Sequence, residues 1–437
     1  MKKALLIFLL STTLTSLALV VTMDFGSSQA QTQIRGILKQ DTTWTKQGSP
    51  YVFTGAVGVA DGTTLSIEAG VLVDFGSYYL QVNGTLNAEG TSDEPIYFSS
   101  NSQIQEPPSD LLNTYPSVFS NPNILLVYGN PVCNLKHVVL DQTSFQAQSF
   151  VSNATLTLDH CSLLGGSSVN LWGTTRISDS YINGSVQVRG DSTITGSIFL
   201  CGLDIAGSCS GSRFVGTYSV LGNNITNQQN GIVLNAGDIG TIKDNVIWGG
   251  SIGICQGDGF PMMSAKILNN LITDNQIGIY TRTPRDDSTI IDNSILRNKI
   301  GISTPSPKQT ITGNNFENTQ YNIQAGVSAV SATNNWWGTT DRASIDQKIY
   351  DSNDDFSLGT IVYYPFSTST NSNAPESPSD MMLPTTAPLP TEGVTYQTVS
   401  HENAESLSGL EIGVGTAVII VAVLVSVIAV RNHRKRV

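Results

Sequence analysis

Six asparagines recur along the second half of the chain at nearly constant spacing. They stand in similar short motifs, such as LGNNIT, IKDNVI and IDNSI, and are separated by 21, 25, 23, 22 and 20 residues. The six positions are Asn224, Asn245, Asn270, Asn293, Asn315 and Asn335. Such a period is too short for the common helical repeats, which need about 33 residues or more. Two architectures remain, leucine-rich repeats and a β-solenoid.

A second sequence feature recurs with the same period as the asparagines. Seven or eight residues after each of the first five comes a short apolar signal: Gly231-Ile232, Gly253-Ile254, Gly278-Ile279, Gly301-Ile302 and Asn322-Ile323. The L-x-x-L-x-L pattern of leucine-rich repeats does not occur. In a β-helix each coil pairs with the coils about 4.8 Å away. We predict an all-β, right-handed parallel β-helix of about a dozen coils, each of about 17 to 25 residues.

The asparagines have a predicted role in this fold. An amide at one fixed turn position can donate and accept along the axis, so we expect the six to form a side-chain ladder. In shorter earlier coils Cys161, Ser180 and Ser197 stand at corresponding places, 19 and 17 residues apart.

The two ends of the chain predict export and membrane anchoring. Residues 1–30 combine Lys2 and Lys3 with an apolar run and a small-x-small site ending at Ala30, which is typical of a signal peptide. Residues 410–430 predict a transmembrane helix, and 431–437 a basic cytoplasmic tail. The bulk of the chain would then be extracellular. Sortase-like near misses at 383–387 and 389–393 lie too far before the apolar run.

Between these ends we expect one elongated ectodomain over residues 31–366. It would begin with a cap over 31–64 and close with a C-terminal cap over 336–366. Residues 367–409 are rich in Ser, Thr and Pro, which predicts a disordered stalk.

Composition excludes some partners and cofactors. The formal net charge is −12, so nucleic acid is not an expected partner. Five cysteines are an odd number, and Cys201 with Cys209 is the one close pair, a possible disulfide. Four histidines without metal-ligand spacing predict no metal site. Ca²⁺ at Asp354 and Asp355 is the alternative to plain turn capping.

Potential N-glycosylation sites occur at four sequons. Asn83, Asn153 and Asn183 could accept sugar, whereas Asn224 should stay unmodified because we assign it to the ladder.

Two insertions leave the repeat at the same edge of consecutive coils. They would bring together Asp258, Phe260, Arg282, Arg285, Asp286 and Asp287. One interpretation is a contact for a glycan or a protein, and the other is a pair of solvated loops with local ion pairs. We find no paired carboxylates, Gly-His-Gly or Arg-x-Lys on adjacent coils, and His160 falls on a turn, so no catalytic residue is assigned.

Adjacent tryptophans mark the place where the asparagine repeat stops. Trp336 and Trp337 could form a sugar platform, but an open β-helix end must be covered, so we predict a core plug. Thr339 or Thr340 would then cap a short helix that carries Ile345, with Ile349 one turn further on.

The segments TTLSIEAGVLVDFG and LQVNGTLNAEGTSDEPIYF near the start, with NNWWGTTD and IVYYPF near the end, resemble the right-handed β-helix repeat surface proteins of archaea and bacteria. This resemblance implies a pectate-lyase-like fold, and most members lack an assigned activity. We therefore expect a non-enzymatic surface protein with a structural or recognition role toward glycans or surface proteins. The alternatives are a polysaccharide-active enzyme and a self-assembling surface-layer or adhesion component.

Overall fold

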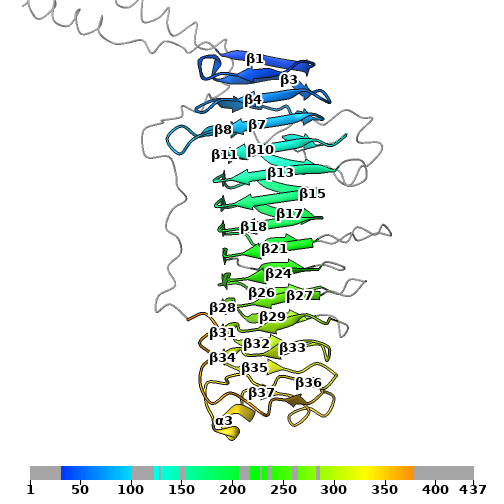
Figure 1. Ribbon diagram of the computed structural model, residues 1–437, viewed down its shortest axis with the longest axis vertical. Coiled ribbons are helices and arrows are strands. Elements are labelled where there is room, and N and C mark those ends of the chain that lie inside the picture. Colours follow the sequence, from blue (N-terminus) through cyan, green and yellow to red (C-terminus); the bar gives the residue numbers. More distant parts are fainter. Residues whose placement is uncertain are drawn as a thin grey trace, which may run out of the picture. The chain divides into compact units, whose positions relative to one another are not determined.

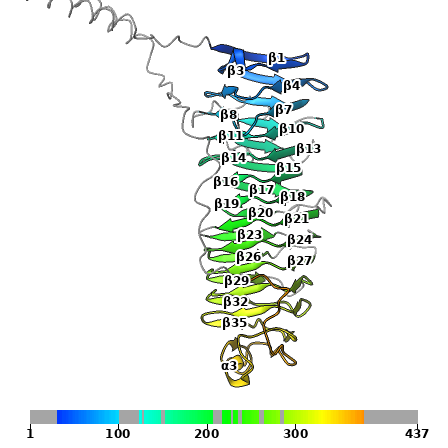
Figure 2. The ribbon, with the colours of Figure 1, turned by 60° about the vertical axis from the view of Figure 1, so that its left-hand side comes forward.

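The computed structural model describes residues 31–100, 123–126, 129–147, 153–205, 217–226, 229–234, 239–257, 264–281 and 286–376. These residues wind into a right-handed parallel β-helix of about 11 turns, as the repeat predicts. Figures 1 and 2 show strands of successive turns lying side by side along one axis. A regular turn contributes three short strands, and successive turns align them in three parallel stacks.

The first stack comprises β2 (Thr42–Trp44), β4 (Thr64–Ile67), β7 (Thr85–Glu89), β10 (Val132–Lys136), β13 (Ala154–Asp159), the second half of β15 (Ser168–Ser178), β18 (Ser192–Thr195), β21 (Thr217–Leu221), β24 (Ile239–Lys243), β27 (Ser264–Leu268), β30 (Thr289–Ile291) and β33 (Thr310–Thr312). The second comprises β5 (Leu72–Asp74), β8 (Ile96–Ser99), β11 (Val138–Asp141), β14 (Ser162–Leu163), β16 (Tyr181–Ile182), β19 (Ile198–Phe199), β22 (Asn224–Thr226), β25 (Val246–Trp248), β28 (Leu271–Thr273), β31 (Ser294–Leu296) and β34 (Asn315–Glu317).

The third stack comprises β6 (Leu80–Val82), β9 (Ile124–Leu126), β12 (Ser144–Ala147), the first half of β15, β17 (Ser185–Arg189), β20 (Leu203–Ile205), β23 (Asn230–Leu234), β26 (Ile252–Gln256), β29 (Ile277–Thr281), β32 (Ile300–Ser303), β35 (Tyr321–Gln324) and β37 (Ile349–Tyr350). β1 (Thr32–Leu38) and β3 (Tyr51–Val59) start the second and third stacks, with η1 (Lys46–Gly48) between them.

Isoleucine columns fill the core of the later turns. Each strand alternates inward and outward side chains, and parallel pairing places equivalent inward residues on top of one another. In the first stack the column is Ile242, Ile267, Ile290 and Ile311. In the third it is Ile232, Ile254, Ile279, Ile302 and Ile323. β-branched side chains suit strands that pack on all sides, so the repeat supplies both the strands and the core.

The asparagine ladder lies one residue away from two of its predicted positions. It runs through Asn223, Asn245, Asn270, Asn293, Asn314 and Asn335, and each Nδ2 donates to the next Oδ1 at 2.9 to 3.0 Å. Asn224 and Asn315 are therefore wrong as members. They are instead the first residues of strands β22 and β34. The asparagine directly before each of them, Asn223 or Asn314, has the side chain that faces inward, and both side chains are buried.

The ladder continues toward the N-terminus through smaller side chains. The backbone N–H of Cys161 donates to Ser180 Oγ, that of Ser180 to Ser197 Oγ, and that of Ser197 to Asn223 Oδ1, at 2.9 to 3.1 Å. These are the places that the sequence aligned with the asparagines.

A second ladder occupies the turn before the third stack. Asn275 Nδ2 donates to Asn298 Oδ1, and Asn298 Nδ2 donates to Asn318 Oδ1, both at 3.0 Å. All three side chains are buried. This second ladder was not predicted, although Asn275 and Asn298 both lie three residues before a Gly-Ile pair.

The C-terminal plug is the second tryptophan. Trp337 is buried and stacks on Phe316 at 5.0 Å between ring centroids, whereas Trp336 is half-buried and pairs its backbone with Asn315. Trp336 is thus wrong as the plug, because its backbone continues the second stack and turns the next side chain inward.

A short helix and a pair of two-residue strands close the end of the β-helix next to Trp337. Helix α3 (Arg342–Asp346) is capped by Asp341, whose side chain accepts from Ser344 N, so the predicted caps at Thr339 and Thr340 are wrong. Thr339 instead accepts from the backbone N–H of Asp341. β36 (Val330–Ser331) pairs with β38 (Ile361–Val362) beside it.

The first residues of the predicted stalk are ordered. Asn371 Nδ2 donates to Asp292 Oδ1 at 2.7 Å and to Gly313 O at 2.6 Å, and Asn315 Nδ2 donates to Asn371 O at 3.0 Å. Ala374 is buried. Disorder is therefore wrong for residues 367–376, since the polar side chains bind the turns instead of solvent.

Several predicted segments lie outside the described residues. These are the signal peptide over 1–30, the remainder of the stalk, the transmembrane helix over 410–430 and the basic tail. None of the helices in the described ranges has the length and hydrophobicity of a membrane span.

The ladder register gives a matched pair of variants. Asn223→Ala should lower the free energy of unfolding by about 3 kcal/mol, because the buried Ile194 O and Ser197 N–H lose their partner and Asn245 Oδ1 loses one of its two donors. Asn224→Ala removes one bond from Trp248 Nε1 and should cost about 1 kcal/mol. Urea unfolding of both variants checks this, and equal losses would contradict the observed register.

The plug gives a second pair. Trp337→Ala should cost about 3 to 5 kcal/mol, because it opens a cavity against Phe316 and Tyr363. Trp336→Ala should cost clearly less, since that side chain is half-buried. Denaturant unfolding of the two variants, side by side, provides the measurement.

Candidate functional site

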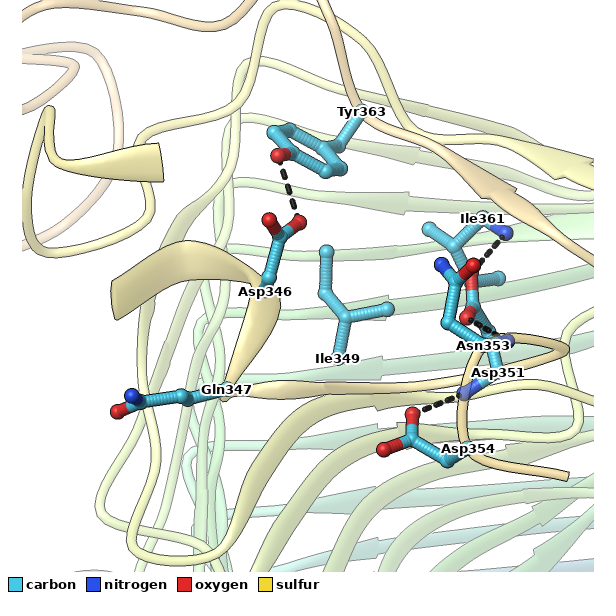
Figure 3. Close-up of a pocket in the computed structure, with 8 residues that line it drawn as sticks. All are labelled: Asp346, Gln347, Ile349, Asp351, Asn353, Asp354, Ile361 and Tyr363. Carbon is cyan, nitrogen blue, oxygen red and sulfur yellow. Dashed lines mark hydrogen bonds between the residues drawn. The ribbon is translucent and has the colours of Figure 1, made fainter. Parts of the chain in front are cut away.

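A cleft of about 260 Å³ opens in the C-terminal cap, between the end of α3, the turn after β37 and strand β38. We call it the cap cleft (Figure 3). Its lining residues are Asp346, Gln347, Ile349, Asp351, Asn353, Asp354, Ile361 and Tyr363. The repeat ends before these residues, so the fold of the cap fixes their positions, and the repeating coil pattern does not.

Asp351 holds one wall of the cap cleft together. Its side chain is buried, and its two oxygens accept from the backbone N–H groups of Asn353 and Ile361, each at 2.9 Å. Asp354 Oδ2 accepts from Asp351 N at 3.1 Å. These bonds tie the turn to β38, which gives the cleft a fixed shape.

Tyr363 and Asp346 meet at the other side of the cap cleft (Figure 3). The Tyr363 hydroxyl donates to Asp346 Oδ1 at 2.7 Å. Burial, this hydrogen bond and the Asp346 charge raise the pKa of Tyr363 to about 12, so the hydroxyl stays a donor at neutral pH.

The lining of the cap cleft is rich in acceptors. It contains three carboxylates, two amides and one phenol, and none of the eight residues is cationic. Carboxylate oxygens keep lone pairs beyond the bonds described above. The cleft therefore suits ligands that donate hydrogen bonds and disfavours anions.

Asp354 and Asp355, the candidate Ca²⁺ ligands, serve in turns. Besides the Asp354 bond, Asp355 Oδ1 accepts from Ser357 N at 2.9 Å and from Ser357 Oγ at 2.7 Å. These hydrogen bonds are the ones expected if the two aspartates cap a turn, which is the alternative to Ca²⁺ binding.

The structure changes the interpretation of the two-loop site. Asp258, Phe260, Arg282 and Arg285 lie outside the described residues. Asp286 is wholly buried, so its prediction as a ligand contact is wrong: its side chain is bonded to Ser288 and Gln309 and is not exposed to a ligand. Asp287 is half-buried beside it.

Asp286 belongs to a buried polar network across three turns. Its Oδ1 accepts from Ser288 N at 2.8 Å, and Gln309 Nε2 lies 3.2 Å from its Oδ2. Gln256 Nε2 donates to Ser288 Oγ at 3.0 Å, and Thr281 Oγ1 donates to Gln256 Oε1 at 2.9 Å. The network joins the strand ends from which the two loops depart. No repeated spacing in the sequence marks these residues, so the sequence does not predict the network.

Burial raises the pKa of Asp286, and the nearby Asp287 adds to this, while hydrogen bonds from Ser288 and Gln309 oppose it. The carboxyl group is therefore held toward its neutral form inside the network.

The predicted modification sites are placed as follows. Cys201 is exposed, and Cys209 lies outside the described residues, so their pairing stays a prediction. Asn153 is exposed, and Asn83 and Asn183 are half-buried. Asn224 is not in the ladder, so the reason for expecting it to stay unmodified is wrong.

A group of potential metal ligands lies on the outside of neighbouring turns. One donor atom from each of Asp159, His160 and Asp179 lies within 4.8 Å of the others. His160 is on a turn, as the sequence predicts.

Comparison with known proteins gives a family match and distant structural likenesses. Residues 152–352 match the family described as NosD, periplasmic copper-binding protein. No curated protein has a significantly similar sequence. This match and the observed topology agree with the resemblance to pectate-lyase-like parallel β-helix proteins.

Two solved structures illustrate the structural likenesses. The periplasmic alginate epimerase AlgG is 11% identical, with a TM-score of 0.44, over 76% of this chain and 84% of that chain. The A-module of the Azotobacter vinelandii mannuronan C-5 epimerase AlgE4 is 12% identical, with a TM-score of 0.27, over 75% and 89%. Similarities this low assign no activity to this chain.

The raised pKa of Asp286 predicts a pH dependence of stability. A carboxyl group whose pKa is higher in the folded state stabilises fully below its unfolded pKa of about 3.9, and this contribution is lost as pH rises through the folded pKa. Asp286→Asn should remove a component of the unfolding free energy that falls from about pH 4 upward. Denaturant unfolding across pH checks it, with the exposed Asp93→Asn as control, which should keep the wild-type slope.

Proposed function

We propose that this chain is a non-catalytic recognition protein outside the cytoplasm, and that its cap cleft binds an uncharged glycan. The observation that carries the proposal is the lining of the cleft, which offers carboxylates, amides and a phenol without a cationic side chain. Sugar hydroxyls donate to such acceptors, and the side-chain amides of Gln347 and Asn353 supply donors in return. The apolar sides of Ile349 and Ile361 contribute a small non-polar surface.

The same lining argues against the enzyme alternative for acidic polysaccharides. A polyuronate brings a carboxylate on each sugar, which three aspartates would repel. Asp351 and Asp354 already accept backbone hydrogen bonds, and Asp346 accepts from Tyr363. These carboxylates have structural partners, and a general acid or base needs one free to exchange a proton with substrate.

Its expected location supports this proposal. The matching family is described as periplasmic, which is consistent with a chain whose bulk lies outside the cytoplasm. The predicted signal peptide and C-terminal anchor would place the β-helix at the cell surface. The glycans of that surface, or of neighbouring cells, would then be within reach.

Recognition of a surface protein is a second candidate. Val327, Phe356 and Tyr364 of the cap region are 80, 99 and 61% exposed. Exposed apolar side chains of this size are typical of protein contacts. If the ligand is a protein, Phe356→Ser should abolish its binding while the cap cleft stays intact.

A glycan array with the purified full chain tests the proposal. We expect binding to neutral glycans, weakened about tenfold by Asp346→Ala, because a hydrogen bond to a charged group contributes about 1.5 kcal/mol or more. Asp355→Asn, in the turn after β37 and outside the lining of the cleft, is the control and should bind as the wild type does.

Two results would contradict the proposal. One is turnover of any polysaccharide, monitored by release of reducing or unsaturated ends. The other is a preference for polyuronates that Asp346→Ala leaves unchanged.

A further inference from the structure

The last described residues of the chain lie against the outer face of the second stack. We call residues 367–376 the strap. Its hydrogen bonds reach three successive turns, moving from the cap toward the N-terminal end, in the pairs Ser367–Asn335, Asn371–Asn315 and Pro375–Ser294, at 2.5 to 2.9 Å. In Figure 1 the strap is the orange segment that ends beside β31. The chain thus runs back along the β-helix instead of leaving it at the cap.

The strap covers part of a column of outward side chains. Parallel pairing aligns one residue from each turn of the second stack, in the order Tyr181, Ile198, Asn224, Val246, Leu271, Ser294 and Asn315. The last three are only 2, 1 and 8% exposed. The residue after each of them belongs to the core, so their own side chains face away from it. The strap bonds to two of the three and buries this end of the column.

The rest of the column is more exposed and largely apolar. Val246, Ile198 and Tyr181 are half-buried, and so is Trp248, two residues after Val246 on the same face. Trp248 Nε1 donates to Asn224 Oδ1 at 2.9 Å, which ties the indole to this face. We call Tyr181, Ile198, Val246 and Trp248 the apolar strip. It carries no charge, and it continues directly from the surface that the strap covers.

The chain after the strap has the length to reach this strip. Tyr181 lies five turns from Ser294, or about 24 Å at the usual strand spacing. An extended chain advances about 3.3 Å per residue, so about seven or eight residues after Pro375 span the distance. The run Met-Met-Leu at 381–383 falls at this reach. It is the one run of three large apolar residues between 367 and 409.

We propose that residues 377–383, which lie outside the described residues, continue the strap along the second stack and pack Met381, Met382 and Leu383 on the apolar strip. Covering apolar side chains stabilises the docked state. Methionine side chains adapt to irregular surfaces, and their sulfur atoms pack well against aromatic rings such as Tyr181 and Trp248. The strip shares no residue with the cap cleft, so this docking does not depend on the proposed function.

The competing occupant of the apolar strip is a second copy of the chain. Two copies with a formal net charge of −12 repel each other. A segment attached to the docked strap is instead present at an effective concentration on the order of millimolar. The segment of the same chain is therefore favoured over a second copy.

Hydroxyl-radical footprinting of the purified full chain, read residue by residue by mass spectrometry, tests the proposal. The triple variant Met381→Ser/Met382→Ser/Leu383→Ser should raise the oxidation rates of Tyr181 and Trp248 severalfold, because their rings lose their cover. All three substitutions lie outside the β-helix, so its folding is not at stake.

Two controls accompany the triple variant. Leu389→Ser, further along the same segment and beyond the calculated reach, should leave the oxidation rates of Tyr181 and Trp248 as in the wild type. Trp172, on the third stack, is the internal reference and should oxidise at one rate in all variants.

The reciprocal variant changes the strip and keeps the segment. Ile198→Ser/Val246→Ser should raise the oxidation rates of Met381 and Met382, with a circular dichroism spectrum like that of the wild type. The matched control is Ile291→Ser, a half-buried outward residue of the first stack, which should leave both methionine rates unchanged.

Either of two outcomes would overturn the proposal. Equal oxidation of Tyr181 and Trp248 in the wild type and the triple variant would show that this segment does not cover the strip. Protection of the two rings that rises with protein concentration would assign the strip to a second copy.

Discussion

Side-chain hydrogen bonds that run along the axis of the β-helix align its turns from Cys161 to Asn335. In the asparagine ladder one amide satisfies its own coil and the next: Asn270 Nδ2 donates to Leu268 O, Ile242 O and Asn293 Oδ1. A buried amide that lost these partners would cost several kcal/mol of desolvation. The ladder therefore enforces one register, and the isoleucine columns above and below follow from it.

This constraint also shapes the surface. Because the ladder residue turns inward, its predecessor must turn outward with left-handed backbone, which creates a regular external row. Most of the row carries glycine, asparagine or aspartate, and His137 and His160 are a local departure from it. Two further groups of polar side chains lie where the repeat breaks: the buried network that contains Asp286, and the cap cleft after β37.

The last coil has no following coil to cover its core. Its core would face solvent, so Trp337 stacks on Phe316 and α3 with β38 folds over it. The same closure brings Asp346 and Tyr363 together and ties Asp351 to Ile361. The cap cleft is thus a by-product of ending the solenoid, and it lies where a binding surface can vary without disturbing the repeat.

Pairs of identical adjacent residues limited the prediction of which side chain faces the core. In LGNNIT and TGNNF either asparagine fits the period, and the choice between Asn223 and Asn224 depends on which side chain the neighbouring strand leaves inside. Trp336 and Trp337 pose the same problem. The second ladder was present in the sequence as Asn275 and Asn298 before Gly-Ile pairs, and His137 and His160 are one coil length apart, 23 residues. Neither spacing stands out until the turns are aligned.

The sequence by itself determined the solenoid, since a 22-residue period with alternating isoleucines has few ways to bury its apolar groups. It also determined the place where the solenoid ends. Only the tertiary structure decided which member of each doublet faces inward, that Asp286 is buried, and that residues 367–376 pack on the turns. These outcomes depend on contacts between residues about 20 to 80 positions apart, which a local pattern does not encode.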